Sequence, residues 1–173
     1  MKGLIPEIIN KFNVYNEGTQ YLGVSGAVQL PNLDAIMETI SGAGILGEYE
    51  TAVPGHFSSM QQEVPFRILE EEAFDMVQMD SSVNLTFRAS EQSTVKATGG
   101  IQTRGMRVVE RGRFKAFNAG SFENGKQMGA SVTLEILYFM VEIAGKQVVE
   151  LDKLNSVFKV NGKDMLAKIN AYA

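Results

Sequence analysis

Alternation of apolar and polar residues with a period of two is the feature that most constrains how this sequence folds. Successive side chains of a β-strand point to opposite faces of the sheet, so alternation gives one buried and one exposed face. Residues 83–90 carry Val, Leu, Phe and Ala at every second position, with Asn, Thr, Arg and Ser between them. The same period recurs along the chain, and the sequence therefore predicts a mostly β fold.

Three more segments are predicted strands, and their two faces differ. Residues 21–30 place apolar residues on one face, opposite a small, polar face that includes Tyr21, Ser25 and Gln29. Residues 131–143 are apolar on both faces at their centre, which indicates a strand covered on both sides. Residues 106–117 combine an apolar face with a basic one, formed by Arg107, Arg111, Arg113 and Lys115.

Turns and helices are expected between the strands. Asn124-Gly125, Ala144-Gly145 and Asn161-Gly162 each place a glycine where a tight turn needs positive φ, and hairpins are expected at the first two. Residues 67–79 have the apolar stripe of an amphipathic helix, and a second, short helix is expected from about Lys163 to the end.

Length and composition indicate one soluble domain spanning residues 1–173. The 173 residues are 45% hydrophobic, enough for one core. The net charge of −4 gives no overall attraction to nucleic acid or to an anionic membrane. No cysteine is present, which excludes disulfides and thiolate metal sites. Neither a signal peptide nor an apolar run of roughly 20 residues is found, so neither export by a signal nor direct membrane anchoring is expected.

No pattern of catalytic residues emerges, and we predict no catalytic, metal or cofactor site. His56 is the sole histidine, so a zinc site would lack a second imidazole. The consecutive acids Glu70, Glu71 and Glu72 would point in different directions on a helix. Ser58-Ser59 lacks a nucleophile elbow, and no glycine-rich phosphate loop is present.

The basic face of residues 107–115 is the one feature that favours another class of function, a small nucleic-acid-binding β-barrel. Cationic side chains on one strand can contact phosphates, and aromatic rings can stack on bases. However, Phe114 belongs to the opposite face of this strand. A solvated face, or pairing with this acidic protein's own carboxylates, explains the pattern at least as well.

Two apolar segments fit poorly inside a compact monomer. One is an N-terminal arm, residues 1–14, and the other is a long glycine-rich loop or hairpin, residues 38–60. Either segment docks on another copy or folds back over its own sheet edges. The residues that we expect at a subunit interface are Leu4, Ile8, Phe12, Gly44, Ile45, Leu46 and Tyr49.

An ordered series of motifs resembles the major tail tube protein of contractile phage tails and of R-type bacteriocin particles, nearly end to end. The N-terminal matches are residues 13–18, Tyr21-Leu22-Gly23, Leu30-Pro31 and the glycine-rich stretch 41–47. The central matches are residues 83–89 and 111–115. The C-terminal matches are the most specific: Leu137-Tyr138-Phe139, Gly145, Glu150-Leu151-Asp152, Asn155, Phe158, residues 160–164 and Leu166. The acidic residues 70–72 and the short C-terminal helix depart from the family pattern.

The resemblance implies a β-barrel or β-sandwich protomer with one or two short flanking helices. Its sheets would join into a ring with a continuous inner barrel, typically hexameric, and the arm and the loop would reach neighbouring rings. The stacked rings would form a non-enzymatic conduit for DNA or ions. An acidic lumen would suit the passage of DNA, because weak or repulsive contact with phosphate lets the polymer slide. Tyr21, Ser25 and Gln29 would contribute to the lumen or to a subunit seam.

The partners implied are the chain itself and the sheath, baseplate or tube-initiator, tape-measure and tail-terminator proteins, with DNA as transiting cargo. Assembly would occur in the bacterial cytoplasm, and the product would be a virion tail or a released tail-like particle. The tube of a bacterial contractile secretion system is the alternative within the same class.

Overall fold

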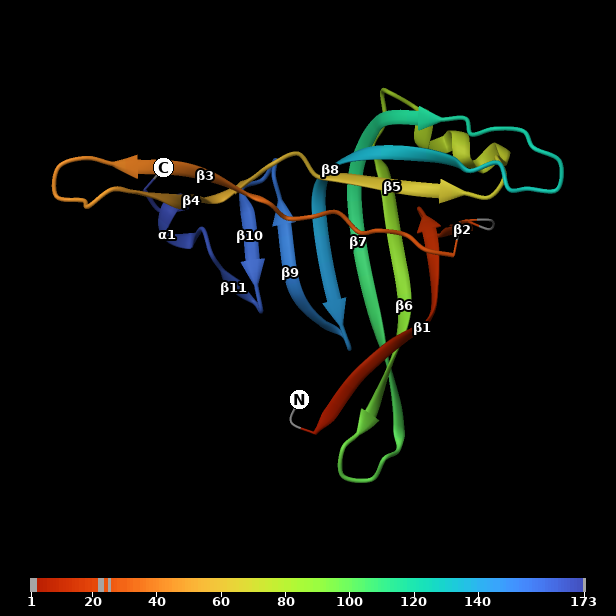
Figure 1. The fold of residues 1–173 in the computed structure, drawn as a ribbon, viewed down its shortest axis with the longest axis horizontal. Coiled ribbons are helices and arrows are strands. Elements are labelled where there is room, and N and C mark those ends of the chain that lie inside the picture. The colour runs from red at the N-terminus through yellow and green to blue at the C-terminus, as the bar shows by residue number, and fades with distance from the viewer. Residues whose placement is uncertain (1–2, 22–23, 25, 173) are drawn as a thin grey trace.

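Antiparallel strands organise the chain in the computed structural model, which describes residues 3–21, 24 and 26–172 (Figure 1). Strands make up 58% of the structure and helices 7%, which confirms the prediction of a mostly β protein with short helices. Nine strands of the described part form one sheet in the order β11-β10-β9-β8-β7-β6-β1-β2, with β5 paired to β8. A separate two-stranded sheet contains β3 and β4.

The large sheet draws on most of the chain. Its strands are β1 (Leu4–Asn16), β2 (Thr19–Tyr21), β5 (Gln61–Phe66), β6 (Val83–Val95), β7 (Ile101–Asn118), β8 (Ala130–Ile143), β9 (Lys146–Asp152), β10 (Val157–Val160) and β11 (Lys163–Asp164). The other elements are β3 (Ala35–Ser41), β4 (Glu48–Phe57), the 3₁₀-helix η1 (Glu71–Val77) and α1 (Ala167–Asn170).

The strands predicted at residues 83–90, 106–117 and 131–143 lie within β6, β7 and β8. In β6 the apolar residues Val83, Leu85 and Phe87 are buried, as the alternation predicts. In β8 the first half pairs with β5 and the end of β7, whereas the second half pairs with β9 and the start of β7. The apolar centre of this strand thus lies where these two parts of the sheet meet.

A bend in β7 and β8 folds the end of β7, the start of β8 and β5 over the rest of the sheet (Figure 1). The β7–β8 register shifts between Arg111 and Gly112, which marks a β-bulge, and bulges bend strands. A Cβ atom at Gly112 would collide with the carbonyl oxygen of Glu135. Glycine is therefore required where the two backbones approach closely at the bend.

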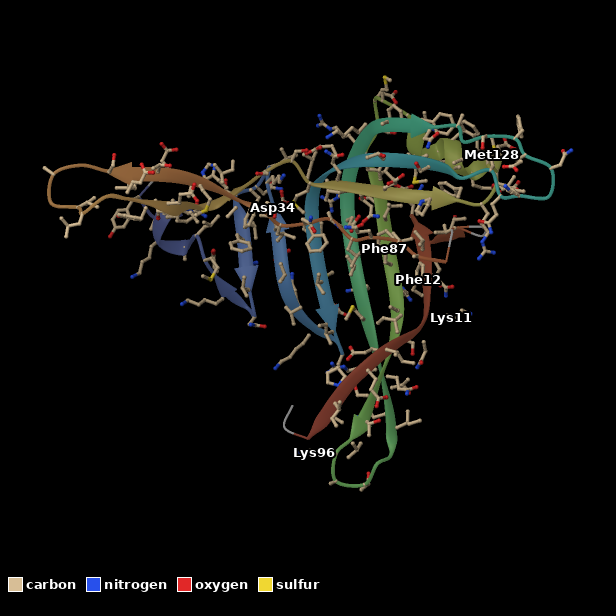
Figure 2. The ribbon with its side chains drawn as sticks, in the orientation of Figure 1. Lys11, Phe12, Asp34, Phe87, Lys96 and Met128 are labelled. Carbon is tan, nitrogen blue, oxygen red and sulfur yellow. The ribbon has the colours of Figure 1, made fainter. Side chains whose placement is uncertain are left out.

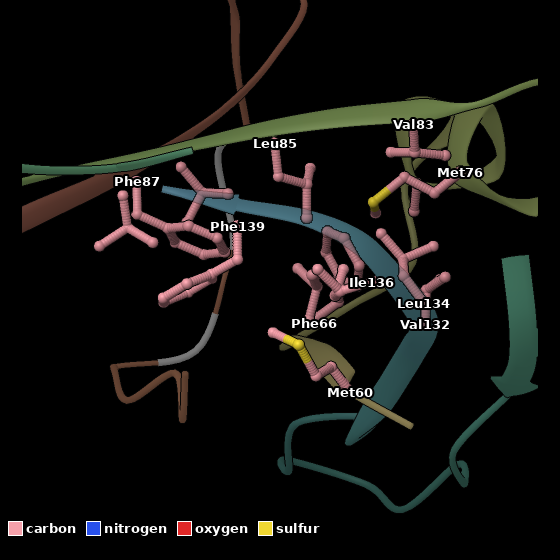
Figure 3. Close-up of a cluster of buried hydrophobic side chains, with 14 of the residues drawn as sticks. Met60, Phe66, Met76, Val83, Leu85, Phe87, Val132, Leu134, Ile136 and Phe139 are labelled. Carbon is pink, nitrogen blue, oxygen red and sulfur yellow. The ribbon is translucent and has the colours of Figure 1, made fainter. Parts of the chain in front are cut away.

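The core lies inside this bend (Figure 3) and contains Met60, Phe66, Met76, Leu85, Leu134 and Ile136, all fully buried or nearly so. Cross-strand pairing extends the core as a row of apolar side chains across six strands. Directly opposed residues share a face, and the register aligns Val160, Val149, Val141, Val108, Phe87 and Val14. We call the side of the sheet that carries this row the core face.

The strand predicted for residues 21–30 is wrong for residues 26–30, whereas residues 22, 23 and 25 lie outside the described residues. Strand β2 ends at Tyr21, Val24 forms only an isolated bridge with Phe66, and residues 26–34 are not in a strand. Val28 packs against the core, and the Gln29 carbonyl accepts a hydrogen bond of 3.0 Å from the Gln62 side chain. A side chain thus satisfies this carbonyl, and the segment covers the core without a neighbouring strand.

The N-terminal segment is not an arm ahead of the first strand, as the sequence suggested, because Leu4–Asn16 is itself the first strand, β1. It pairs antiparallel with β6, from Leu4 opposite Val95 to Asn16 opposite Leu85. Two register shifts interrupt the pairing, at Glu7 and Asn10. Pairing with β6 satisfies backbone groups that a free arm would leave to solvent.

The two helices are shorter than predicted. Residues 67–79 contain the 3₁₀-helix η1 and no long α-helix, and Ala73 and Met76 are its buried residues. Residues three apart share a face of a 3₁₀-helix, which suits this pair. At the C-terminus, Lys163–Asp164 forms strand β11, and α1 begins only at Ala167.

The expected turns are present. Ala144 and Gly145 have φ angles of 50° and 76° and join β8 to β9 as a tight hairpin. Asn161 and Gly162, with φ of 51° and 80°, join β10 to β11 in the same way. Asn124-Gly125 lies in a longer connection, residues 119–129, between the antiparallel neighbours β7 and β8.

Candidate functional site

The face of the sheet opposite the core face is polar and charged. Register and alternation place side chains from β6 to β9 on it, and we call it the polar sheet face: Arg88, Arg107, Arg111, Tyr138, Glu142 and Glu150. In β7 this face includes part of the basic pattern read from the sequence. This face can bind an anionic ligand only if its cations have no partners within the protein.

A carboxylate of the neighbouring strand pairs with one of these arginines, and two lysines on other strand segments are paired in the same way. Arg107 donates a hydrogen bond of 2.6 Å to Glu142, directly opposite it in β8. Lys159 of β10 lies 3.3 Å from Glu150 of β9. Further along β7, on the bent part of the sheet, the Lys115 ammonium lies 3.0 Å from Glu135.

Arg111 is held by different contacts. Its guanidinium lies 5.0 Å from the centroid of the Tyr138 ring and donates a hydrogen bond of 3.0 Å to the Asn84 side chain. The Tyr138 hydroxyl in turn donates to Glu150, at 3.2 Å. Burial and the nearby Glu150 carboxylate raise the pKa of Tyr138. The contacts therefore run from β6 across to β9.

This geometry supports one of the two interpretations of the basic strand. Arg107 and Lys115 are paired with the protein's own carboxylates, and Phe114 packs against the core on the other side. Burial alone would raise the pKa of Glu135, but hydrogen bonds from Ser59 and Lys115 outweigh it and lower the pKa. Three of the four basic residues of this strand, Arg107, Arg111 and Lys115, thus have partners within the protein, which favours internal pairing over nucleic-acid binding.

Residues 38–60 form most of a hairpin that extends away from the large sheet (Figure 1). Strands β3 and β4 pair from Ala35 opposite Phe57 to Ser41 opposite Glu48. Every residue from 41 to 50 is exposed, including the predicted interface residues Gly44, Ile45, Leu46 and Tyr49. Leu46 at the tip is fully exposed, and Tyr49 is 54% exposed.

Two contacts fix the base of the hairpin to the C-terminal part of the chain, one in strand β10 and one just after strand β11. The Phe57 ring packs edge-on against Phe158 of β10, with ring centroids 4.9 Å apart. Leu166 is buried against the backbone of Gly55, where a Cβ atom would lie 2.6 Å from a Leu166 methyl carbon. Gly55 also has φ of +76°, a conformation that favours glycine. The sequence alone indicated neither contact.

The three predicted interface residues of β1 lie on different faces. Leu4 and Phe12 are opposite Val95 and Ala89, on the core face, and both are half-buried. The two register shifts turn Ile8 to the other face, where it is 56% exposed. The irregular pairing with β6 therefore separates Ile8 from Leu4 and Phe12.

The predicted lumen or seam residues are only partly described. Tyr21 pairs with Val14 through its backbone, its side chain is not described, and Ser25 lies outside the described residues. Gln29 is exposed, in the segment that covers the core face.

The sequence pattern did not single out one buried acid, Glu110. Glu110 of β7 lies on the core face between Leu85 and Phe139, and it is fully buried. Neither of its carboxylate oxygens has a hydrogen-bond partner in the described part of the chain. Burial raises its pKa to about 8. The sequence did hold a sign of this burial, because Glu110 occupies one of the alternating apolar positions of β7.

The part of the chain that the structure describes offers no cluster of side chains for binding a metal ion. It contains no group of three or more His, Asp or Glu side chains able to hold a metal ion. His56 is exposed in the β3–β4 hairpin. None of the described helices has the length and apolar character needed to cross a membrane.

Comparison with known proteins identifies the family. The family model described as phage tail tube protein FII matches residues 6–172. The tail tube protein of Escherichia phage P2 is 30% identical over 167 residues, which cover 94% of each chain. The major tail tube protein of Serratia phage KSP20 is 22% identical over 161 residues, which cover 93% of this chain and 91% of that protein. These matches run through the strands of the sheet and the projecting hairpin, and the chain therefore belongs to the phage tail tube protein FII family.

Proposed function

We propose that copies of this structural tail tube protein join edge to edge into rings, and that the rings stack into the inner tube of a contractile tail. The proposal rests on one observation: within the residues that the structure describes, the large sheet has an edge strand with unpaired backbone groups at each of its two ends. Strand β2 pairs with β1 only over Val14–Asn16, so Leu4–Asn13 form the outer edge at one end of the described sheet. At the other end lies β11, with two residues.

Unpaired sheet edges favour association with further strands, and burying them in an assembly removes the exposed backbone groups. The β1 edge also carries exposed apolar residues, Ile5, Ile8 and Ile9. Because the two edges differ, contact between them is head to tail, and such contacts close into a ring when the rotation per subunit allows it. A hexamer is the ring that the family resemblance implies.

The polar sheet face is the surface that we propose for the channel. Most of the core face is covered by η1, β5 and the segment 26–34, so the opposite face is the one free to line a lumen. Arg107 is paired with Glu142, and Arg111 is held by Tyr138 and Asn84. The Arg88 guanidinium lies 5.5 Å from the centroid of the Tyr15 ring. Cations held in this way have little capacity to bind phosphate, so DNA would pass without sticking. Gln29, on the core side, fits a subunit seam better than the lumen.

The tube would serve as a conduit for DNA through the target envelope, without a catalytic role of its own. Its partners would be the sheath, the baseplate or tube initiator, the tape measure and the tail terminator. Assembly would take place in the bacterial cytoplasm, and the product would be a virion tail. In this proposal the lumen carries paired opposite charges on the polar sheet face, in place of the acidic lumen expected from repulsion of phosphate.

The experiment that tests this proposal is negative-stain electron microscopy of the concentrated protein, with light scattering on the same sample. Hollow rings or tubes are the expected result. A species that stays monomeric, even when mixed with the tube initiator, would refute it. In that case salt-dependent binding to single-stranded DNA or RNA would be the next measurement, since it tests the nucleic-acid-binding β-barrel.

A further inference from the structure

The described structure contains an apolar groove that its own chain leaves open. The groove has a volume of about 160 Å³ and lies on the core face at the β1 end of the sheet. It is open to solvent and its walls are largely apolar. The residues that line it include Ile9, Phe12, Leu30, Phe87, Met106 and Val108.

Figure 2 labels Phe12 and Phe87, which mark this place on β1 and β6. The Arg104–Glu91 ion pair, at 2.6 Å, lies beside the groove on the same face of the sheet, because Glu91 is the residue opposite Ile9. An apolar cavity of about 150 Å³ accepts a benzene-sized group. The groove is therefore large enough for an aliphatic or aromatic side chain.

The same chain carries an apolar tip with nothing to pack against. Ile45, Leu46 and Tyr49 are exposed at the end of the β3–β4 hairpin, which points away from β1, β6 and β7 (Figure 1). The hairpin base is fixed on β10 by the contact between Phe57 and Phe158. The tip therefore cannot reach the groove of its own subunit without losing that contact.

Register places the hairpin and the groove on the same side of the sheet. Phe158 is opposite Leu151, Leu151 is opposite Phe139, and Phe139 continues the row through Glu110 to Leu85. All of these residues are on the core face, which also carries the groove. The hairpin thus leaves the β10 end of the sheet on the core face, and the groove lies on that face at the β1 end.

We propose that the hairpin tip of one subunit seats in the apolar groove of the next subunit within the ring. This inference rests on the proposed ring, in which the β10–β11 end of one copy meets the β1 end of its neighbour. A hairpin that extends past its own sheet on the core face then overlies the neighbour's β1, β6 and β7. The occupant of the groove is a second copy of this chain.

Cysteine trapping tests the seat directly, because the natural chain has no cysteine. Leu46→Cys combined with Ile9→Cys places one thiol on the tip and one in the groove. The matched control combines Leu46→Cys with Lys11→Cys, because Lys11 is close to Ile9 in β1 and exposed but faces the other side of the sheet, opposite Ser90. Oxidation of assembled protein is followed by non-reducing gel electrophoresis.

The expected result is a ladder of disulfide-linked subunits from the Ile9 pair, which is weak or absent from the Lys11 pair. Because a lateral seat links each subunit to the next around one ring, the ladder ends at a covalently closed ring. A ladder without an upper limit would show that the tip docks on a stacked ring and would overturn the lateral seat. So would tubes that form normally and give no link, or equal links from both pairs.

A second variant tests the energetics without a new covalent bond. Leu46→Asp places a charge on the tip, and we expect the protein concentration for half-maximal assembly to rise roughly tenfold or more. The monomer should unfold at the same denaturant concentration as the natural chain, because Leu46 is fully exposed. Unchanged assembly of Leu46→Asp would overturn the seat while leaving the tube itself intact. Failure of the natural chain to form rings or tubes would instead refute the proposed function, and this inference with it.

Discussion

Phe57 of strand β4 packs edge-on against Phe158 of strand β10, with ring centroids 4.9 Å apart and planes inclined by 67°. This contact ties the base of the projecting hairpin to one end of the large sheet. It joins residues that are separated by about a hundred positions in the chain, and it determines the direction in which the apolar tip points. Edge-to-face aromatic pairs stabilise beyond the area that they bury.

We expect Phe57→Ala to lower the free energy of unfolding by about 1–2 kcal/mol, because Phe57 is half-buried and loses its aromatic partner. Assembly should suffer more than stability, since the hairpin is no longer held in one direction. Urea unfolding of the dilute protein and light scattering of the concentrated protein separate the two effects. Phe57→Tyr keeps the ring and serves as the control, with near-normal assembly. Normal assembly of Phe57→Ala would show that the anchor is dispensable.

Ile8→Asp tests the edge strand β1 on the side of the polar sheet face. The side chain is 56% exposed in the isolated chain, so the substitution should change the unfolding midpoint little. A charge buried at a subunit contact is costly, and ring formation should be lost. Sedimentation velocity and electron microscopy provide the readouts. Phe12→Asp is the contrast: it packs against the core, so it should destabilise the monomer as well. Tubes from a folded Ile8→Asp protein would exclude this residue from the interface.

Glu110 predicts an unusual pH dependence. Its pKa is about 8 in the folded protein because of burial, compared with an ordinary value of 4.5. Between these values the folded state keeps a proton that the unfolded state releases. The contribution of Glu110 to stability therefore falls as pH rises through this window, by roughly 1.4 kcal/mol per unit.

Glu110→Leu should remove this dependence, because leucine matches its neighbours Leu85 and Phe139 and does not titrate. We expect the variant to be more stable than the natural chain at pH 8 and to show a smaller difference at pH 5. Urea unfolding at both values, at a dilution where one species is present, measures the effect. An equal difference at the two pH values would contradict a raised pKa at this carboxyl.

Gly112→Ala should be strongly destabilising, by roughly 2 kcal/mol or more, because its Cβ would collide with the Glu135 carbonyl oxygen at the bend. Gly105→Ala is a matched control on the same strand, since a Cβ there meets no atom within 4 Å. Thermal unfolding of the two variants measures the effect, and we expect a lower melting temperature for Gly112→Ala than for Gly105→Ala. Equal melting temperatures would mean that the bend adjusts without cost.

The polar sheet face predicts weak binding to DNA that increases when its carboxylates are neutralised. In Glu142→Gln the partner of Arg107 loses its charge, and adding Glu150→Gln does the same beside Tyr138 and Lys159. We expect the double variant to bind duplex DNA more tightly than the natural chain, with a steeper salt dependence. Fluorescence anisotropy at two salt concentrations measures this. Tight binding by the natural chain would argue against a channel through which DNA slides.

The sequence determined the local features that depend on neighbouring residues. Alternation in residues 83–90 predicted a strand with one buried face, because side-chain direction in a strand depends only on position along it. The turn at Ala144-Gly145 followed from the conformational freedom of glycine. The family resemblance rested on motifs such as residues 160–164, and the comparisons confirmed it.

Only the tertiary structure decided which strands pair and which apolar residues remain uncovered. Residues 26–34 lack a strand partner because the Gln62 side chain and the core stabilise them instead. Ile8 and Phe12 face opposite sides because β1 has an irregular register against β6. The direction of the β3–β4 hairpin depends on Phe158, far away in the sequence. Such outcomes arise from competition among contacts distant in the chain, and the spacing of residues along it carries no record of that competition.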